Sequence, residues 1–270
     1  MDQEARYEVE RAKWDAHAHH SHAIRELGPE DVVAPDVTFA TYSAEHLGLS
    51  GMAEFLGDLE GRRILEYGCG LGALTVVLAK SGARVTTFDL SQASIDVARQ
   101  RAELNGVADR VEFHVSGGEK LPFESGTFDL AIGKAILHHL DPEAGARELA
   151  RVLAPGGRAT FSEPLGTNPL VVFARAHIPY PGKHERGADR PLTVADLAAW
   201  RAPFAEFRLR PIQLLSMVER GLGFGHKIPI LRRADAEILR RVPAAWRLCR
   251  YAVLYMRKSD AVDETARQEA

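Results

Sequence analysis

The stretch that decides the fold is Arg62-Arg63-Ile64-Leu65-Glu66-Tyr67-Gly68-Cys69-Gly70-Leu71-Gly72-Ala73. Its apolar residues predict a strand that runs into a glycine turn, and Leu74 to Ala79 predict a helix that leaves the turn. Gly68 and Gly70 have no Cβ, so a ligand can lie against bare backbone. The first turn of the helix adds backbone N–H groups without helical partners. The stretch therefore predicts a ligand site at the end of a buried strand.

A second short strand, Arg84 to Asp89, follows and ends in a carboxylate. Strand, glycine turn, helix, strand and acid form the layout that binds a nucleoside at the carboxyl ends of a parallel sheet, with the acid on the ribose hydroxyls. The glycine pattern also satisfies the dinucleotide fingerprint, so an NAD(P)-dependent oxidoreductase is an alternative. Glu66 favours another ligand, because its carboxylate would repel a pyrophosphate and suits an ammonium or sulfonium group.

Three further segments follow in a characteristic order: Glu119-Lys120-Leu121-Pro122-Phe123 with Phe128-Asp129-Leu130, then Leu137-His138-His139-Leu140, then Leu153-Ala154-Pro155-Gly156-Gly157. With the glycine turn they resemble the class I S-adenosylmethionine-dependent methyltransferases, most closely the small-molecule, methyltransferase type 11-like branch. The resemblance covers residues 62–164. It implies an α/β fold with a Rossmann-like, doubly wound, seven-stranded sheet, mostly parallel with an antiparallel seventh strand, plus a helical cap or lid.

The resemblance also implies S-adenosyl-L-methionine as cofactor and assigns residues to it. Gly68, Cys69 and Gly70 are expected against its methionine and ribose part. Glu66 is expected to accept from the ammonium, directly or through water, and to help hold the turn. Asp89 is expected to take both ribose hydroxyls in a charge-assisted bidentate contact.

At the adenine end, Leu90 is expected to pack on the ring, and the backbone of Gly118 and Glu119 to read its edge. The carbonyl of Lys134 is expected to face the ammonium. The sequence departs from the family at Ser116-Gly117-Gly118, because this branch commonly carries an acid where Gly117 stands. That departure favours a further alternative, a methyltransferase-fold protein with a cyclase or ligand-binding role.

Methyl transfer is an in-line displacement, and a nucleophile with a weakly acidic proton benefits from a general base. His138 and His139 follow the fourth strand of the core, so either is a candidate base; the other reading is a structural or orienting role. Tyr42, His177 and His184 are candidate substrate contacts. The apolar piece from Leu170 to Phe173 indicates a hydrophobic acceptor, as expected of specialised metabolites, methylated at O, N or C.

We predict four segments: an N-terminal helical cap (1–60), the cofactor-binding core (61–164), a lid insertion (165–200), and the C-terminal part of the sheet with the tail (201–270). Residues 2–27 predict a helix, with a sparse apolar stripe that includes Tyr7, Trp14 and Ala18. Residues 36–42 are expected to be irregular, and residues 207–217 and 248–258 to be the last two strands. The histidines between His17 and His22 are expected to be solvated, and no metal site is predicted.

The composition bounds the remaining possibilities. The net charge of −3 argues against broad nucleic-acid binding, and no apolar run approaches the roughly 20 residues of a membrane span. Two cysteines are too few for a disulfide framework, and the amino terminus lacks an apolar signal, so a cytoplasmic location is expected. Residues 201–258 hold 13 Lys and Arg against 4 Asp and Glu, which is +9. That stretch is either a solvated basic face or an attraction for an acidic partner. Homo-oligomerisation through the N-terminal helix is a further expectation.

Overall fold

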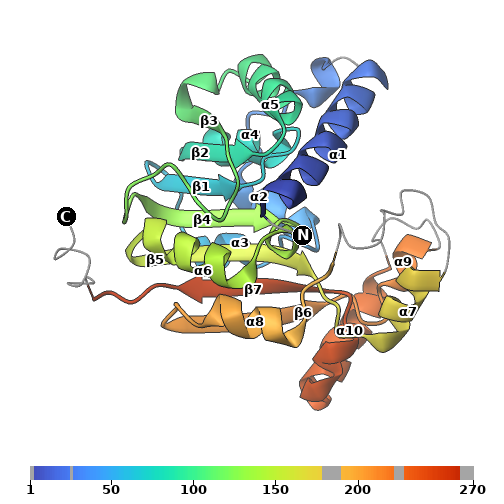
Figure 1. Ribbon diagram of the computed structural model, residues 1–270. Coiled ribbons are helices and arrows are strands. Elements are labelled where there is room, and N and C mark those ends of the chain that lie inside the picture. The colour runs from blue at the N-terminus through green and yellow to red at the C-terminus, as the bar shows by residue number, and fades with distance from the viewer. Residues whose placement is uncertain (1–2, 25–26, 178–189, 222–227, 262–270) are drawn as a thin grey trace.

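A seven-stranded sheet with helices on both faces forms the centre of the molecule (Figure 1). The computed structural model describes residues 3–24, 27–177, 190–221 and 228–261. The strand order is β3-β2-β1-β4-β5-β7-β6. All pairs are parallel except those of β7, which runs antiparallel to both β5 and β6, and this confirms the predicted fold class. The strands are β1 (Arg63–Tyr67), β2 (Arg84–Asp89), β3 (Val111–Val115), β4 (Phe128–Lys134), β5 (Leu153–Pro164), β6 (Glu206–Ile212) and β7 (Tyr251–Arg257).

Several helices, among them α2, α5, α6 and α8, begin at a capping side chain. Ser91 accepts from the backbone N–H of Ser94, and Thr193 accepts from that of Asp196. The α-helices are α1 (Gln3–Ile24), α2 (Phe39–Glu45), α3 (Met52–Leu56), α4 (Ala73–Lys80), α5 (Gln92–Leu104), α6 (Pro142–Val152), α7 (Pro169–His177), α8 (Val194–Arg201), α9 (Val218–Gly221) and α10 (Pro229–Arg241). Short 3-10 helices are η1 (Pro29–Asp31), η2 (Ala108–Arg110), η3 (Leu137–His139) and η4 (Pro243–Leu248).

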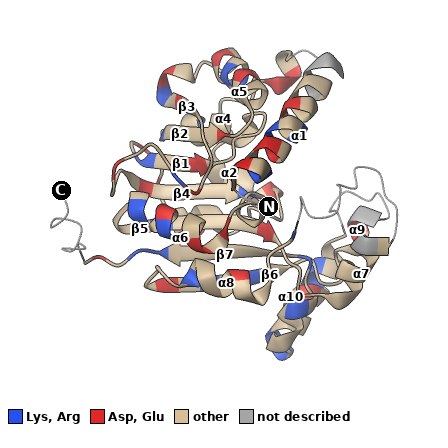
Figure 2. Cartoon of the chain, in the orientation of Figure 1, with Lys and Arg blue, Asp and Glu red and all other residues tan. Residues whose placement is uncertain are grey.

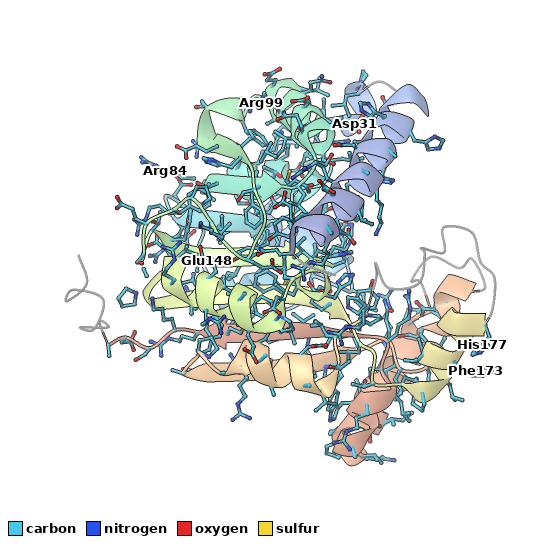
Figure 3. The ribbon with its side chains drawn as sticks, in the orientation of Figure 1. Asp31, Arg84, Arg99, Glu148, Phe173 and His177 are labelled. Carbon is cyan, nitrogen blue, oxygen red and sulfur yellow. The ribbon has the colours of Figure 1, made fainter. Side chains whose placement is uncertain are left out.

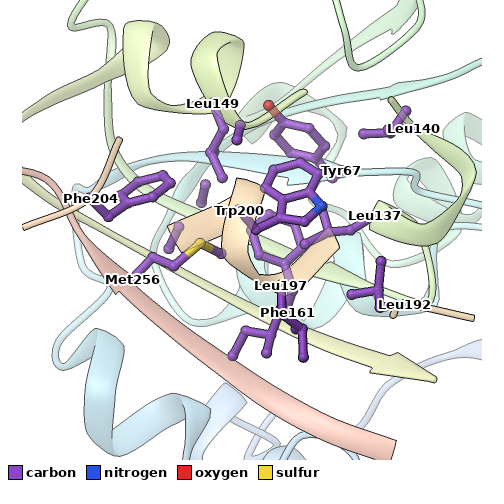
Figure 4. Close-up of a cluster of buried hydrophobic side chains, with 14 of the residues drawn as sticks. Tyr67, Leu137, Leu140, Leu149, Phe161, Leu192, Leu197, Trp200, Phe204 and Met256 are labelled. Atoms are coloured by element: carbon purple, nitrogen blue, oxygen red, sulfur yellow. The ribbon is translucent and has the colours of Figure 1, made fainter. Parts of the chain in front are cut away.

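Alternation along β1 divides the core into two layers. Leu65 and Tyr67 face a cluster that includes Leu149 of α6 and Trp200 of α8 (Figure 4). Ile64 faces the opposite cluster, which receives α2, α3 and α4. Successive strand residues point to opposite faces, so a strand buried on both sides must be apolar nearly throughout. Glu66 is therefore the exception that needs a local explanation.

Three predicted boundaries were wrong for physical reasons. Residues 36–42 are not wholly irregular, because Thr38 caps α2 and accepts from the backbone N–H of Thr41. β6 ends at Ile212 rather than at residue 217, because Gln213 adopts a left-handed φ of 62°. The next backbone N–H groups then donate to the buried carboxylate of Asp235 instead of to a strand. The sequence pattern predicts the fifth strand from Gly157 to Glu163, but β5 starts at Leu153, four residues earlier, through a register shift against β4.

The segment boundaries remain predictions, although the elements in them now have places. α1 packs on α5 near the carboxyl end of the sheet (Figure 1). α8, at the end of the predicted lid insertion, packs on α6 in the helical layer of the core. No helix among the described residues is long and apolar enough to cross a membrane.

Several arginines of the basic stretch 201–258 contact other residues of the chain. Arginines gather on α10 (Figure 2), where Arg240 and Arg241 both pair with Glu237. On β6, Arg210 binds Ser50 and Arg208 lies over the ring of Phe55. These contacts favour the reading of a basic face with structural partners over that of a site for an acidic ligand.

Candidate cofactor and acceptor site

A cavity of about 170 Å³ lies where β1, β2 and β4 end, with α1 across it. It collects seven residues that the sequence predicted for the site: Gly68, Gly70, Asp89, Leu90, Gly118, Lys134 and His139. The other lining residues are Tyr7, Glu10, Trp14, Phe88, Ser116, Ala135, Ile136 and Leu140. The site therefore has a floor, formed by the strand ends and the glycine turn, and a roof, formed by α1.

The floor owes its shape to glycines with left-handed backbone. Gly68 and Gly70 have φ values of 68° and 49°, which residues with a Cβ rarely adopt. At Gly72 a Cβ would lie 2.7 Å from the Cα of Ala98, so this glycine lets α5 approach the turn. Cys69 is buried and donates its N–H to the carbonyl of Phe88; its side chain does not line the cavity.

Asp89 is held in place by backbone donors on both carboxylate oxygens. The N–H of Gly70 donates to Oδ2 and the N–H of Ser91 donates to Oδ1, each at 3.0 Å. Burial raises the pKa of Asp89, and these donors oppose that rise. Each carboxylate oxygen has a second lone pair, so the group can still accept from two ligand hydroxyls.

Glu66 lies under the floor rather than in the cavity. Its Oε2 accepts from the Thr75 hydroxyl of α4 at 2.6 Å, which ties the strand to the helix after the turn. Burial raises the pKa of Glu66 to about 7. Near neutral pH the carboxyl is thus partly protonated, and repulsion of a pyrophosphate is a weaker argument than the sequence suggested. Its predicted contact with an ammonium stays a prediction.

The Glu119 side chain binds α1 rather than the cavity. Oε2 accepts from the hydroxyl of Tyr7 at 2.8 Å and from the side-chain amide of Gln3 at 2.6 Å. Oε1 binds Arg6 and the backbone N–H of Asp141. With its carboxylate so occupied, Glu119 has only its backbone left for the predicted adenine contact.

The two predicted catalytic histidines lie in different surroundings. His138 Nδ1 lies 2.8 Å from Glu163 Oε2, and the other oxygen of this fully buried carboxylate accepts from the N–H groups of Ile136 and Leu137. His139 lines the cavity, with Nδ1 3.1 Å from Glu10 Oε1 of α1. The two rings are 4.1 Å apart. Only His139 therefore faces the space where a ligand would lie.

Two predicted substrate residues, Tyr42 and His177, do not line the cavity. Tyr42 stacks on His46 at 4.1 Å and packs on the core layer of α2, α3 and α4. His177 is exposed on α7 and stacks on Phe173, away from the sheet (Figure 3). His184 lies outside the described residues. Within the part of the chain that the structure describes, no three potential metal ligands cluster.

The sequence reasoning missed the roof residues Tyr7, Glu10 and Trp14. They lie at positions i, i+3 and i+7 of α1, so they share one helical face. Tyr7 and Trp14 were visible as part of the apolar stripe. Nothing local in the sequence said which surface this stripe would cover.

A comparison with protein families matches residues 65–161 to the methyltransferase domain. The matched residues are 97 of the chain's 270, and they resemble a methyltransferase domain. The match spans β1 to β5 and so includes the whole floor of the cavity, which confirms the resemblance inferred from the motifs. S-adenosylmethionine is the cofactor of this class, and Asp89 and the open backbone at Gly68 and Gly70 fit a nucleoside ligand.

A curated relative, the ubiquinone biosynthesis O-methyltransferase of Bordetella avium (strain 197N), is 38% identical over 149 residues. The match covers 54% of this chain and 58% of that protein, so the chain spans little more than half of the relative's length. Outside these 149 residues the two sequences are not matched.

Solved structures share the methyltransferase fold over nearly the whole chain. The cyclase SpnF has a TM-score of 0.61 at 21% identity, covering 95% of this chain and 97% of that one. A geranyl diphosphate C-methyltransferase from Streptomyces coelicolor A3(2) has a TM-score of 0.57 at 17% identity, covering 95% and 98%. That structure is a complex with Mg²⁺, geranyl diphosphate and S-adenosyl-L-homocysteine.

Proposed function

We propose that this protein is an S-adenosylmethionine-dependent methyltransferase that acts on a small, hydrophobic acceptor. The placement of Asp89 carries the proposal: the carboxylate lines the cavity beside Gly70, with lone pairs left for two hydroxyls. The apolar lining by Trp14, Ile136 and Leu140 supports a hydrophobic acceptor. The names of the relatives, which include an O-methyltransferase of ubiquinone biosynthesis, support an acceptor of this kind.

When bound, S-adenosylmethionine supplies an electrophilic methyl group on a sulfonium. The residues of the chain then orient the acceptor's nucleophile in line with the carbon–sulfur bond, exclude water and remove a proton. We assign the role of general base, which takes up this proton, to His139, because its imidazole faces the cavity. Glu10, 3.1 Å from Nδ1, stabilises the imidazolium that results. His138 is held by Glu163 and orients η3 instead.

Neither alternative gains support from the geometry. An NAD(P)-dependent oxidoreductase is disfavoured by the antiparallel β7 between β5 and β6 and by the methyltransferase-domain match. A non-methylating role was suggested by Gly117, but this glycine has a steric reason, since a Cβ there would collide with Tyr7. The similarity to SpnF concerns the fold alone.

We also propose a cytoplasmic location and a homo-oligomer. Both cysteines are free and buried, which suits a reducing compartment. The inward face of α1 is engaged with the protein's own core, so association through this helix would use its outward face.

Calorimetric titration with S-adenosylmethionine, S-adenosylhomocysteine and NAD(H) tests the proposal. We expect micromolar binding of the first two ligands and none of NAD(H). Asp89→Ala should abolish most of the affinity, while Asp109→Ala, at an exposed acid of η2, is the matched control. Acceptors are then screened by the mass gain of one methyl group. Binding of NAD(H) alone would reject the proposal.

A further inference from the structure

Gly117 is a glycine for a reason different from that of the glycines in the turn. Its φ is not in the left-handed region, so its backbone conformation is open to any residue. A Cβ at this position would lie 2.2 Å from the hydroxyl oxygen of Tyr7 and 2.3 Å from its Cζ. Contacts this short are essentially never seen, so residue 117 and the Tyr7 ring compete for the same space. Space, rather than backbone conformation, requires the glycine.

The Tyr7 ring is itself fixed from several sides. Its hydroxyl donates to Glu119 and accepts from the side-chain amide of Gln3 at 3.1 Å. The guanidinium of Arg6 lies 5.6 Å from the ring centroid. Burial raises the pKa of Tyr7 to about 12, so the phenol stays neutral and remains a donor. Among the charged groups described here, Arg6 and Glu119 are the ones that contact this residue.

The rest of α1 is tied to the floor at two more points. The Ser91 hydroxyl at the start of α5 donates to Asp15 Oδ1 at 2.5 Å, and Glu10 lies beside His139. Beneath these contacts the cavity holds about 170 Å³, less than the roughly 300–1,000 Å³ of ligand pockets in general. A nucleoside larger than this volume would need α1 to shift outward.

We propose that Tyr7 is a cofactor-binding residue of the nucleoside site, and that its ring replaces a side chain at residue 117 as the wall at the purine end. This inference rests on the proposed function, because it names a residue for the same cofactor. Tyr7 lines the cavity together with Leu90, Ser116 and Gly118, the residues expected around the adenine. An aromatic ring packs on any purine without needing a carboxylate to read it. The position of α1 thereby becomes part of cofactor recognition.

Steric competition is tested first, in the ligand-free protein. Hydrogen exchange of residues 3–24 reports whether α1 is docked, and residues 63–89 report whether the core is folded. Gly117→Ala should speed exchange in α1 and leave the core unchanged. In a protein that already carries Tyr7→Ala, Gly117→Ala should change the hydrogen exchange of α1 much less than it does in the wild type. If Gly117→Ala leaves α1 exchange unchanged, or if its effect is the same in both backgrounds, the steric pairing is rejected.

Ligand binding is tested next, with S-adenosylhomocysteine and with adenosine alone as probes. Base–aromatic stacking predicts that Tyr7→Ala weakens both by about fivefold to a hundredfold. Tyr7→Phe keeps the ring and should lose much less. Equal affinities of the wild type and Tyr7→Ala would overturn the inference. Failure of the wild type to bind S-adenosylhomocysteine would reject the proposed function instead, and the exchange experiment would still decide whether Tyr7 and residue 117 compete.

Discussion

The floor and the roof of the cavity are built on different principles. Much of the floor follows from neighbouring elements of the sequence: β1 and the glycine turn position Gly68 and Gly70, and β2 ends at Asp89. The roof comes from α1, which reaches Glu119, 112 residues away from Tyr7 in sequence. The floor is determined by local backbone constraints and the roof by a few long-range polar contacts. Variants of the two parts should therefore fail in different ways.

The largest expected effect concerns the two histidines. His139→Ala should lower kcat by about 10²- to 10⁴-fold, the usual contribution of general acid–base catalysis, with cofactor affinity nearly unchanged. His138→Ala is the comparison, because His138 is paired with the buried Glu163 and does not line the cavity. It should chiefly lower the free energy of unfolding, by about 1–3 kcal/mol. Steady-state kinetics measures the loss of turnover, and urea unfolding measures the loss of stability. An equal loss of kcat in both variants would contradict the assignment of His139 as the general base.

Glu66 gives the floor a pH dependence. Its folded pKa is raised from 4.5 to about 7, so the folded state holds a proton that the unfolded state releases at lower pH. Its contribution to stability is complete below about pH 4.5 and is lost as pH rises through about 7. The loss is at most about 3 kcal/mol. Urea unfolding at pH 5 and pH 8 should show a smaller difference for Glu66→Gln than for the wild type. An identical difference would mean that Glu66 titrates normally.

Asp89→Ala should weaken S-adenosylhomocysteine binding by about 1.5–3 kcal/mol, the scale of hydrogen bonds to a charged group. The fold should remain, because Gly70 and Ser91 lose one acceptor that ligand or water can replace. Isothermal calorimetry, with circular dichroism to verify folding, measures this. Unchanged affinity would remove Asp89 from the ribose site.

Asp15→Ala should have the smallest effect, about 0.5–1.5 kcal/mol on ligand affinity, because it removes only the hydrogen bonds that Ser91 and, at 3.4 Å, Ala93 donate to α1. The expected change is faster ligand dissociation, since the roof is less firmly held while the floor is intact. Stopped-flow measurement of the dissociation rate tests it. A slower rate, or a loss as large as that of Asp89→Ala, would contradict the division into floor and roof.

The floor could be predicted from the sequence because its causes are local. Glycines with forced φ values, a cap at Ser91 and apolar strands of fixed period are properties of neighbouring residues. The sequence pattern predicts strands at 111–115 and 128–134, which are the observed bounds of β3 and β4. The end of β6 was not, because Asp235, which takes over the backbone N–H groups there, lies 19 to 21 residues downstream.

The roof and the roles of single side chains could not be predicted in the same way. The sequence of α1 shows an apolar stripe but not the surface that the stripe covers. Likewise, Leu-His-His-Leu does not indicate which imidazole faces a cavity, since the answer depends on Glu163 and Glu10, two acids from distant elements. From the sequence, Gly117 suggests a lost ligand contact. In the structure, the Tyr7 ring occupies the space that a side chain at residue 117 would need.

Hydrogen exchange with and without S-adenosylhomocysteine tests the central claim most directly, that the floor binds the cofactor and α1 closes on it. The account predicts slower exchange on ligand addition in residues 63–89 and in residues 3–24 together, with the β6 and β7 amides unchanged. Protection of the floor alone would contradict the role of α1. Protection of neither part would contradict the site.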